Sequence, residues 1–325
     1  MATILDGSDP HVIAVAATAL RAGELVAFPT ETVYGLGADA LNEQAVAQVF
    51  AVKNRPFFDP LIVHVPDAAT AALYAVAIPP RAAALMEHFW PGPLTVVLPK
   101  HPRIPDIVTA GLDSVALRVP SHPVALALLQ AVARPIAAPS ANPFGYISPT
   151  TAAHVQDLLG EAIPLIVDGG PCAVGVESTV CAFLDDDAVI LRPGGVTSEA
   201  IEAVIGPVQF SASDRADLRS PGTLPRHYSP HVNLQLTALG DPLPLPLSGE
   251  RVGVLLFTEQ RLTQGYVEVV MLSRDGNLTE AAPRLFAALR WLDCLGLDRV
   301  LVESVPEHGL GRAIMDRLRR AAARD

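Results

Sequence analysis

Two short segments, far apart in the sequence, each place two polar side chains two residues apart. Lys53 and Arg55 form one pair, Ser140 and Asn142 form the other, and a proline directly follows each pair. A residue before proline favours extended geometry, in which residues i and i+2 point to the same side. The cation pair therefore suits phosphate oxygens, and the hydroxyl with the amide suits a sugar, a carboxylate or a base. Either motif alone is equally compatible with a solvated turn.

Two further arginines stand where a cation needs a partner. Arg192 also precedes a proline at the end of a predicted strand, and three cations in such positions favour a polyanionic ligand. Arg118 lies inside a predicted strand over residues 115–119. Because arginine is rarely buried alone, we expect an anion against it, and Glu177 or Asp168 are structural candidates.

Hydroxyl side chains follow the first buried strand. Thr30, Thr32 and Tyr34 share one face if that segment is extended, and they suit a small ligand, although hydroxyls bonded locally are as common at such positions. Gly35 and Gly37 fit a loose dinucleotide-binding pattern, but the preceding strand ends too early for it. We therefore interpret them as turn glycines.

The histidines give a weaker signal. His64 stands on an otherwise apolar strand, where a histidine is more often a satisfied core residue than a catalytic one. His227 and His231 are four residues apart, but no carboxylate or cysteine cluster accompanies them. A metal site made of protein ligands is therefore not predicted.

Composition excludes several classes of protein. The chain has 325 residues, of which 50% are hydrophobic and 18% charged, with a net charge of −11; this suffices for two domains with cores of their own. The acidic balance argues against a protein that grips nucleic acid by neutralising phosphates. We find neither a signal-peptide pattern nor an apolar run near the ~20 residues that span a bilayer, and three sparse cysteines are typical of reduced thiols. We therefore expect a cytoplasmic protein.

The elements that must position these residues follow from apolar periodicity and from proline and glycine punctuation. Helices are predicted over residues 42–52, 80–90, 124–132, 148–159, 197–205, 278–295 and 310–323. Strands are predicted over residues 25–28, 61–65, 94–98, 115–119, 135–138, 165–167, 178–183, 189–191, 232–236, 252–257, 267–272 and 300–302. Lys53 and Arg55 then fall just past a helix, and Ser140 just past a strand.

The order of these elements predicts two α/β domains. Several strands of residues 1–205 follow one another directly, so the first domain is expected to have a curved, mixed sheet. Apolar periodicity vanishes over residues 206–231, and this segment is predicted to be a linker that acts as a lid. Residues 232–325 predict a small Rossmann-like domain. Its arginine-rich last helix is interpreted as a solvated face.

In register, these motifs resemble the threonylcarbamoyl-AMP synthase family. The matching segments are residues 29–37, Lys-x-Arg-Pro at 53–56, Pro-Leu-Ile-Val-His at 60–64, and residues 89–95, 138–142, 168–170, 175–179 and 191–194. They occur in family order and span a YrdC-like catalytic domain. The Ser-Pro-Gly and His-Tyr-x-Pro motifs of the linker, with the domain after it, resemble the longer, two-domain form.

The resemblance implies a reaction and its substrates. L-threonine and bicarbonate would form a carbamate, which would attack the α-phosphate of ATP, accompanied by Mg²⁺, and release pyrophosphate. A partner transferase would then deliver the threonylcarbamoyl group to the adenosine beside the anticodon of certain tRNAs. The family fold implies that the site lies in a concave, positively charged face.

The resemblance also assigns residues. ATP would be bound by Lys53, Arg55, Asp59, Ser114, Asn142, Ser148, Arg192 and Tyr228. Threonine and its carbamate would be bound by Thr30, Thr32, His64, Arg118, Ser140 and Ser178. Lys53 and Arg55 would act in catalysis, Arg118 would pair with the threonine carboxylate, and Tyr228 would close over the nucleotide.

One departure and two alternatives remain open at this point. Asp59 stands where many relatives carry asparagine, and an acid beside phosphates is unusual unless it binds Mg²⁺. The chain could instead be a double-stranded RNA or tRNA-binding module, against which its acidity counts. It could also move carbamoyl groups during cofactor maturation, but such proteins carry zinc fingers, for which this chain has too few cysteines.

Overall fold

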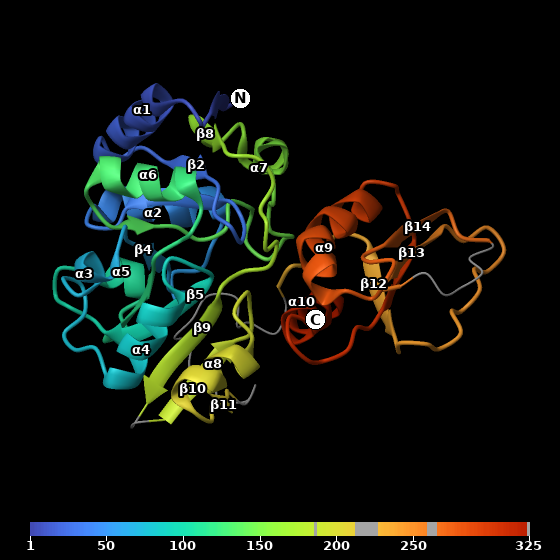
Figure 1. Cartoon of the computed structure of the whole chain (residues 1–325). Coiled ribbons are helices and arrows are strands. Elements are labelled where there is room, and N and C mark those ends of the chain that lie inside the picture. Colours follow the sequence, from blue (N-terminus) through green and yellow to red (C-terminus); the bar gives the residue numbers. More distant parts are fainter. Residues whose placement is uncertain (185–186, 212–226, 259–264, 324–325) are drawn as a thin grey trace.

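The computed structural model describes residues 1–184, 187–211, 227–258 and 265–323. They form two sheets, one of eleven strands and one of four, each with its own helices. In Figure 1 the first unit runs from blue to yellow and the second from orange to red. The predicted fold class, a mixed α/β domain followed by a small Rossmann-like α/β domain, is confirmed. Most of the predicted lid, residues 212–226, lies outside the described residues.

The first sheet mixes parallel and antiparallel pairs. Its strands are β1 (Thr3–Asp6), β2 (Val26–Phe28), β3 (Gly35–Asp39), β4 (Ile62–His64), β5 (Leu94–Pro99), β6 (Ser114–Arg118), β7 (Ile136–Ala137), β8 (Leu165–Asp168), β9 (Thr179–Leu184), β10 (Asp187–Arg192) and β11 (Gln209–Phe210). Their order is β1-β8-β2-β3-β7-β4-β6-β5-β9-β10-β11. Strand β11 pairs with β10, so the sheet continues into the segment predicted to be linker.

Helices cover both faces of this sheet. They are α1 (Pro10–Arg21), α2 (Glu43–Lys53), α3 (Ala68–Ala71), α4 (Pro80–Phe89), α5 (Asp106–Thr109), α6 (Pro123–Val132), α7 (Ala152–Leu159) and α8 (Ser198–Ile205). Because side chains alternate along a strand, Val26 and Phe28 pack beneath α1 and α6, whereas Ala27 faces the core formed with α2 and α4. In Figure 1, α1 and α6 lie near each other at the upper left, close to β2.

Capping side chains fix where the helices begin. Asp9 accepts a hydrogen bond from the backbone N–H of His11 at the start of α1, and Pro10 takes the first helical position, where proline is favoured. The predicted start of α7 at Ser148 is wrong, because Thr151 is its N-cap. This frees Ser148 for a different contact, described below.

Strand β3 corrects the interpretation of Gly35 and Gly37 as turn glycines. Both lie within β3, which pairs antiparallel with β2. A Cβ atom at Gly37 would lie 2.8 Å from the Phe28 ring and 3.0 Å from Ile136. The glycines are therefore needed for close packing against an aromatic ring rather than for a turn.

The second sheet is entirely parallel. Its strands are β12 (Asn233–Thr237), β13 (Val252–Leu256), β14 (Glu268–Met271) and β15 (Arg299–Glu303), in the order β12-β15-β13-β14. Helices α9 (Leu278–Asp293) and α10 (Gly311–Ala322) pack against it. Parallel strands joined by helical crossovers are typical of a Rossmann-like unit.

The two units share a buried surface. Val33, Ile147 and Val176 of the first unit belong to the same apolar cluster as Phe286 of α9. At Gly175, whose φ is +71°, an added Cβ would lie 2.2 Å from the Cα of Pro283. The second unit therefore lies directly on loops of the first, next to the cavity described below.

Candidate active site

Most of the predicted site residues line one cavity, whose volume with its open mouth is about 510 Å³. Those that line it are Thr30, Thr32, Arg55, His64, Arg118, Ser140, Ser178, Arg192 and Tyr228. They come from the ends of β2, β4, β6, β7 and β10, from the start of β9, from the turn after α2 (Glu43–Lys53) and from the end of the linker. Because β7 pairs antiparallel with β4, these strand ends lie at both edges of the sheet, and the segments after β2 and β7 meet the ends of β4 and β6 in the cavity wall.

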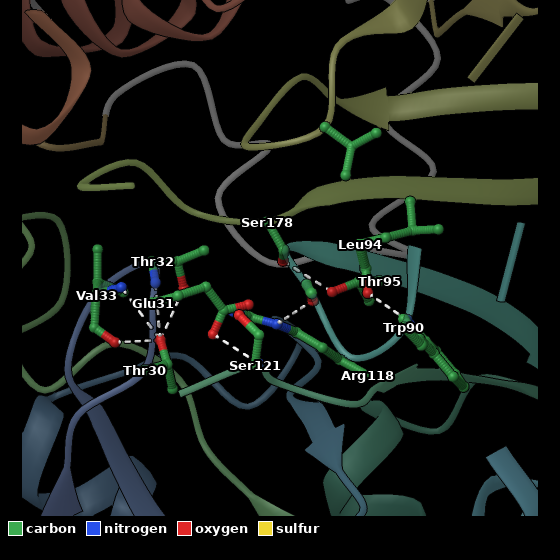
Figure 2. A network of polar contacts seen from close by, with 12 residues as sticks. Thr30, Glu31, Thr32, Val33, Trp90, Leu94, Thr95, Arg118, Ser121 and Ser178 are labelled. Atoms are coloured by element: carbon green, nitrogen blue, oxygen red, sulfur yellow. Dashed lines mark hydrogen bonds and ion pairs between the residues drawn. The ribbon is translucent and has the colours of Figure 1, made fainter. Parts of the chain in front are cut away.

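The segment after β2 is a turn rather than an extended strand. Thr30 Oγ1 donates to the carbonyl of Val33 over 2.6 Å and lies 2.8 Å from Thr32 Oγ1. It also accepts from the backbone N–H groups of Thr32 and Val33, as Figure 2 shows. The hydroxyl of Thr30 is thus used locally, and that of Thr32, also buried, remains beside it in the cavity wall.

The partner of Arg118 differs from the expectation. Its Nη2 lies 2.7 Å from Glu31 Oε1, and both side chains are buried; Figure 2 shows the pair beside the Thr30 turn. Glu31 Oε2 accepts from the N–H of Ser121, which orients the carboxylate. The sequence does predict the need for an anion, but the choice of Glu177 or Asp168 is wrong.

Those two carboxylates have other partners. Glu177 Oε2 accepts from Arg317 Nε of α10 over 2.8 Å, and its Oε1 accepts from Ser148 Oγ over 2.5 Å. Although burial opposes ionisation, the charge of Arg317 lowers the pKa of Glu177. Asp168 accepts a hydrogen bond from Tyr34.

Lys53 does not sit on an extended segment as predicted. It is the last residue of α2, and Asn54 ends the helix in the left-handed region with φ 51°. The buried Lys53 Nζ donates to the backbone carbonyls of Ser140, over 2.6 Å, and of Asn142. Lys53 therefore links the two sequence motifs by hydrogen bonds behind the cavity wall.

Arg55 reaches the cavity from the next turn. It forms a buried ion pair of 2.8 Å with Asp59 and donates to the carbonyls of Asp59 and Pro60. Its guanidinium also lies 5.8 Å from the centre of the Phe144 ring. Asp59 thus neutralises and orients Arg55, which gives this position a physical role.

Ser178 and Arg192 also line the cavity and contact each other. Arg192 Nη2 donates to the Ser178 carbonyl over 2.9 Å and to its Oγ over 3.2 Å. Ser178 Oγ also lies 2.7 Å from Thr95 Oγ1 of β5 (Figure 2). Thr95 is fully buried and was missed by sequence reasoning, since a threonine in an apolar strand resembles an ordinary β-former.

The end of the linker closes one side of the cavity. Tyr228 has φ +60° and is buried, and its ring stacks on Phe286 with centroids 5.7 Å apart. His227 lines the cavity beside it. Burial and the charges of Arg55 and its neighbours hold the pKa of His227 well below its ordinary value, so this imidazole is neutral. The sequence does not identify His227 as a site residue, because its spacing from His231 suggests only a metal ligand.

Four predicted ATP-binding residues besides Lys53 lie outside the cavity wall. Asp59 and Ser148 lie behind it, bonded to Arg55 and Glu177 respectively. Asn142 Nδ2 donates to the carbonyls of Pro143 and Tyr146. Ser114, at the opposite end of β6 from Arg118, lines a separate surface cavity. The structure does not bring Ser114 to the others.

The site is cationic at one end and neutral at the other. Lys53, Arg55 and Arg192 are close enough for their charges to lower the pKa of His227, whereas Thr32 and Ser140 line the neutral part. His64 joins them and is also uncharged, because burial and Arg118 lower its pKa to about 3. Within the described ranges no group of three histidine, cysteine or acidic side chains is arranged to hold a metal.

Comparison with known proteins covers almost the whole chain. A family model described as telomere recombination, of the Sua5, YciO and YrdC proteins, matches residues 18–194. A second model, the threonylcarbamoyl-AMP synthase C-terminal domain, matches residues 196–323. The boundary between the two models falls before α8, so the second model includes the last helix and the last strand of the first unit.

Individual relatives match nearly the whole length of this chain. A threonylcarbamoyl-AMP synthase from Bacillus subtilis is 46% identical, over 98% of this chain and 94% of the relative. The one from Pyrococcus abyssi is 43% identical, over 95% and 94%. The solved structure of P. abyssi Sua5 complexed with L-threonine superposes with a TM-score of 0.89, at 42% identity, over 97% of this chain and 95% of that one.

Proposed function

Because the chain belongs to the threonylcarbamoyl-AMP synthase family, we propose that it forms L-threonylcarbamoyladenylate and pyrophosphate from L-threonine, bicarbonate and ATP. The observation that carries this proposal is the single cavity with a cationic end, at Arg55 and Arg192, and a hydroxyl-lined end at Thr32 and Ser140. The cationic end suits a polyanion, and the hydroxyl-lined end suits a small polar amino acid, so one cavity can bind both.

The chemistry proceeds in two bond-forming steps. The amine of threonine attacks bicarbonate, and loss of water gives the carbamate. A carbamate oxygen then attacks the α-phosphorus of ATP, the bond from that phosphorus to the bridging oxygen breaks, and pyrophosphate leaves with the electron pair. Such a transfer depends on positioning and charge neutralisation more than on an acid or base.

The neutral end suits threonine. Arg118 is the one charged group proposed to meet the amino acid, through its carboxylate, while Glu31 holds the guanidinium in place. Thr32, Ser140 and Ser178 would bond the carbamate and the hydroxyl group. A neutral His64 fits this role, because it adds no second cation beside Arg118. The P. abyssi Sua5 structure, solved with L-threonine, supports threonine as the amino acid.

The cationic end suits the triphosphate. Arg55 and Arg192 line the cavity and would bind phosphate oxygens, while Lys53 holds the Ser140–Asn142 segment through its backbone carbonyls. Ser148 and Asn142 hold the loop beneath the nucleotide. Each carboxylate at the cavity is already paired with an arginine, as at Asp59 and Glu177. Mg²⁺ would therefore enter as part of the ATP complex, held by phosphate oxygens and water.

Exclusion of water is the proposed role of the linker. The product is a mixed anhydride, which water hydrolyses, so a closed site protects it. Tyr228 is buried against α9 at the edge of the cavity. Its position supports the proposal that the linker closes over the nucleotide.

The product belongs to tRNA modification, and its partners follow from that. A threonylcarbamoyl transferase would consume the adenylate in the cytoplasm. No helix of the described residues is long and apolar enough to cross a membrane. The alternative of an RNA-binding module is disfavoured by the net charge of −11. RNA binding that persists near physiological salt would favour it.

Pyrophosphate release tests the proposal. The protein is incubated with ATP and Mg²⁺, and threonine and bicarbonate are omitted in turn. We expect release only when both are present. Release without threonine would overturn the proposal and indicate a different acceptor.

A further inference from the structure

An arginine of the second unit contacts residues of the first unit that lie around the cavity. Arg317, on α10, is fully buried. Its Nε donates to Glu177 over 2.8 Å, and its Nη1 donates to the carbonyl of Pro193 over 2.8 Å and to Asp316. Its guanidinium also lies 5.2 Å from the centre of the Tyr228 ring.

Three of these contacts, those with Glu177, Pro193 and Tyr228, lead to residues proposed to bind the nucleotide. Through Glu177, Arg317 holds the carboxylate to which Ser148 donates. Through the Pro193 carbonyl, it fixes the residue directly after Arg192. Through its cation–π contact, it fixes the lid tyrosine. A guanidinium holds its donors in a rigid planar fork and can meet acceptors on several segments at fixed angles, a geometry that the compact ammonium of lysine does not reproduce.

The other arginines of α10 differ from Arg317. Arg319 is about half exposed and pairs with Glu307 at the surface, and Arg312 is 41% exposed. The interpretation of this helix as a solvated face holds for these two and is wrong for Arg317. A fully buried arginine is costly unless its partners repay the loss of water, so its position indicates a specific role.

Helix α9 supports the neighbouring loop in the same way. Arg290 donates to the carbonyl of Ile147, next to Ser148. Tyr146 donates to Asp293 over 2.6 Å. The second unit thus holds the nucleotide side of the site at the 146–148 loop, at Glu177 and at Pro193. Among the residues that the structure describes, none of its hydrogen bonds or ion pairs reaches Thr32 or Arg118 on the other side.

We infer that Arg317 is a positioning residue for the nucleotide half of the site: it fixes Ser148, Arg192 and Tyr228 in place for the phosphates of ATP. The inference rests on the proposed function and adds to it a role for the C-terminal unit. Arg317 acts through these residues and does not itself line the cavity. Its loss should therefore weaken ATP use while leaving threonine use nearly unchanged.

The test compares variants of the full-length protein. Arg317→Met alone leaves Glu177 buried without its ion-pair partner. The double variant Arg317→Met with Glu177→Gln removes both charges, and we expect it to fold. Arg317→Lys keeps the charge but loses the fork. Glu177→Gln alone separates the contribution of the carboxylate. Arg319→Met, on the same helix, is the matched control.

We expect the KM for ATP to rise about tenfold in the double variant and less in Arg317→Lys, while the KM for threonine changes less than about twofold. Arg319→Met should behave as the wild type. Equal rises in both KM values, or an unchanged KM for ATP in a variant that melts within a few degrees of the wild type, would overturn the inference. So would a single Glu177→Gln variant that reproduces the whole effect.

A direct binding measurement separates this inference from the proposed function. Binding of a fluorescent ATP analogue to the same variants needs no turnover. If the wild type binds ATP but releases no pyrophosphate with threonine and bicarbonate, the proposed function fails, and weaker ATP binding by the double variant still supports the role of Arg317. Equal ATP binding by the wild type and the double variant overturns that role.

Discussion

The guanidinium of Arg118 lies 2.7 Å from the carboxylate of Glu31, and both groups are buried at the threonine end of the cavity. Breaking one partner of a buried ion pair costs about 3 kcal/mol or more, because the other charge is left unpaired. Arg118→Gln should therefore lower the free energy of unfolding by that amount and also abolish threonine binding.

The double variant Arg118→Gln with Glu31→Gln separates these two effects. Removing both charges should recover most of the stability, measured by chemical denaturation, but not threonine binding, measured by calorimetry. Recovery of both would mean that Arg118 only supports the fold.

Lys53 is predicted to hold the Ser140–Asn142 segment in place. Its buried amine donates to two backbone carbonyls, and leaving buried acceptors unsatisfied costs about 1–3 kcal/mol for each. Lys53→Met should lower the free energy of unfolding by about 2 kcal/mol or more and speed hydrogen exchange over residues 140–146. Gln44→Met, an exposed change on the same helix, is the control. An unchanged rate of hydrogen exchange over these residues would show that Lys53 does not hold the segment in place.

His64 should make stability depend on pH. Burial and Arg118 lower its pKa from 6.5 to about 3, so below pH 6.5 the unfolded chain binds a proton that the folded protein does not. Its contribution to stability is therefore full above pH 6.5 and is lost as the pH falls toward 3, by at most about 1.4 kcal/mol per pH unit.

His64→Gln removes this titration. Denaturation curves between pH 5 and 7 should show a smaller loss of stability on acidification for the variant than for the wild type, and comparing the two cancels the other buried histidines. Parallel pH curves would show that His64 titrates in the folded protein as it does in the unfolded chain and would contradict the prediction.

Tyr228 is expected to protect the nucleotide and the product. Tyr228→Ala removes the ring that stacks on Phe286 and meets Arg317. We expect the KM for ATP to rise about tenfold and more of the intermediate to be hydrolysed per pyrophosphate released. Tyr228→Phe keeps the ring and should retain most of the activity. If the alanine variant matches the wild type in both quantities, the lid proposal fails.

The sequence predicts local structure and the membership of the cavity better than it predicts contacts. Strand ends carrying Arg192, Ser140 and His64 could be located because apolar runs stop beside polar residues. Gly35 and Gly37 were misread because local pattern cannot show that Phe28 will pack across them. A glycine needed for close approach looks the same in sequence as a glycine in a turn.

Pairing between distant residues accounts for the other corrections. The Arg118 partner was sought downstream, whereas Glu31 lies in the turn after β2. Arg317 was assigned to a solvated face because α10 is amphipathic and arginine-rich, and only the packing of the second unit on Glu177 buries it. A single sequence holds no signal for which of several charged residues will meet across domains.

The most direct test of the central claim is to identify the product. The protein is supplied with ATP, Mg²⁺, threonine and ¹³C-bicarbonate, and the product is examined by mass spectrometry before it hydrolyses. The account predicts an adenylate that contains threonine and carries the ¹³C label. An adenylate of threonine without the label, or AMP formed with no labelled intermediate, would contradict it.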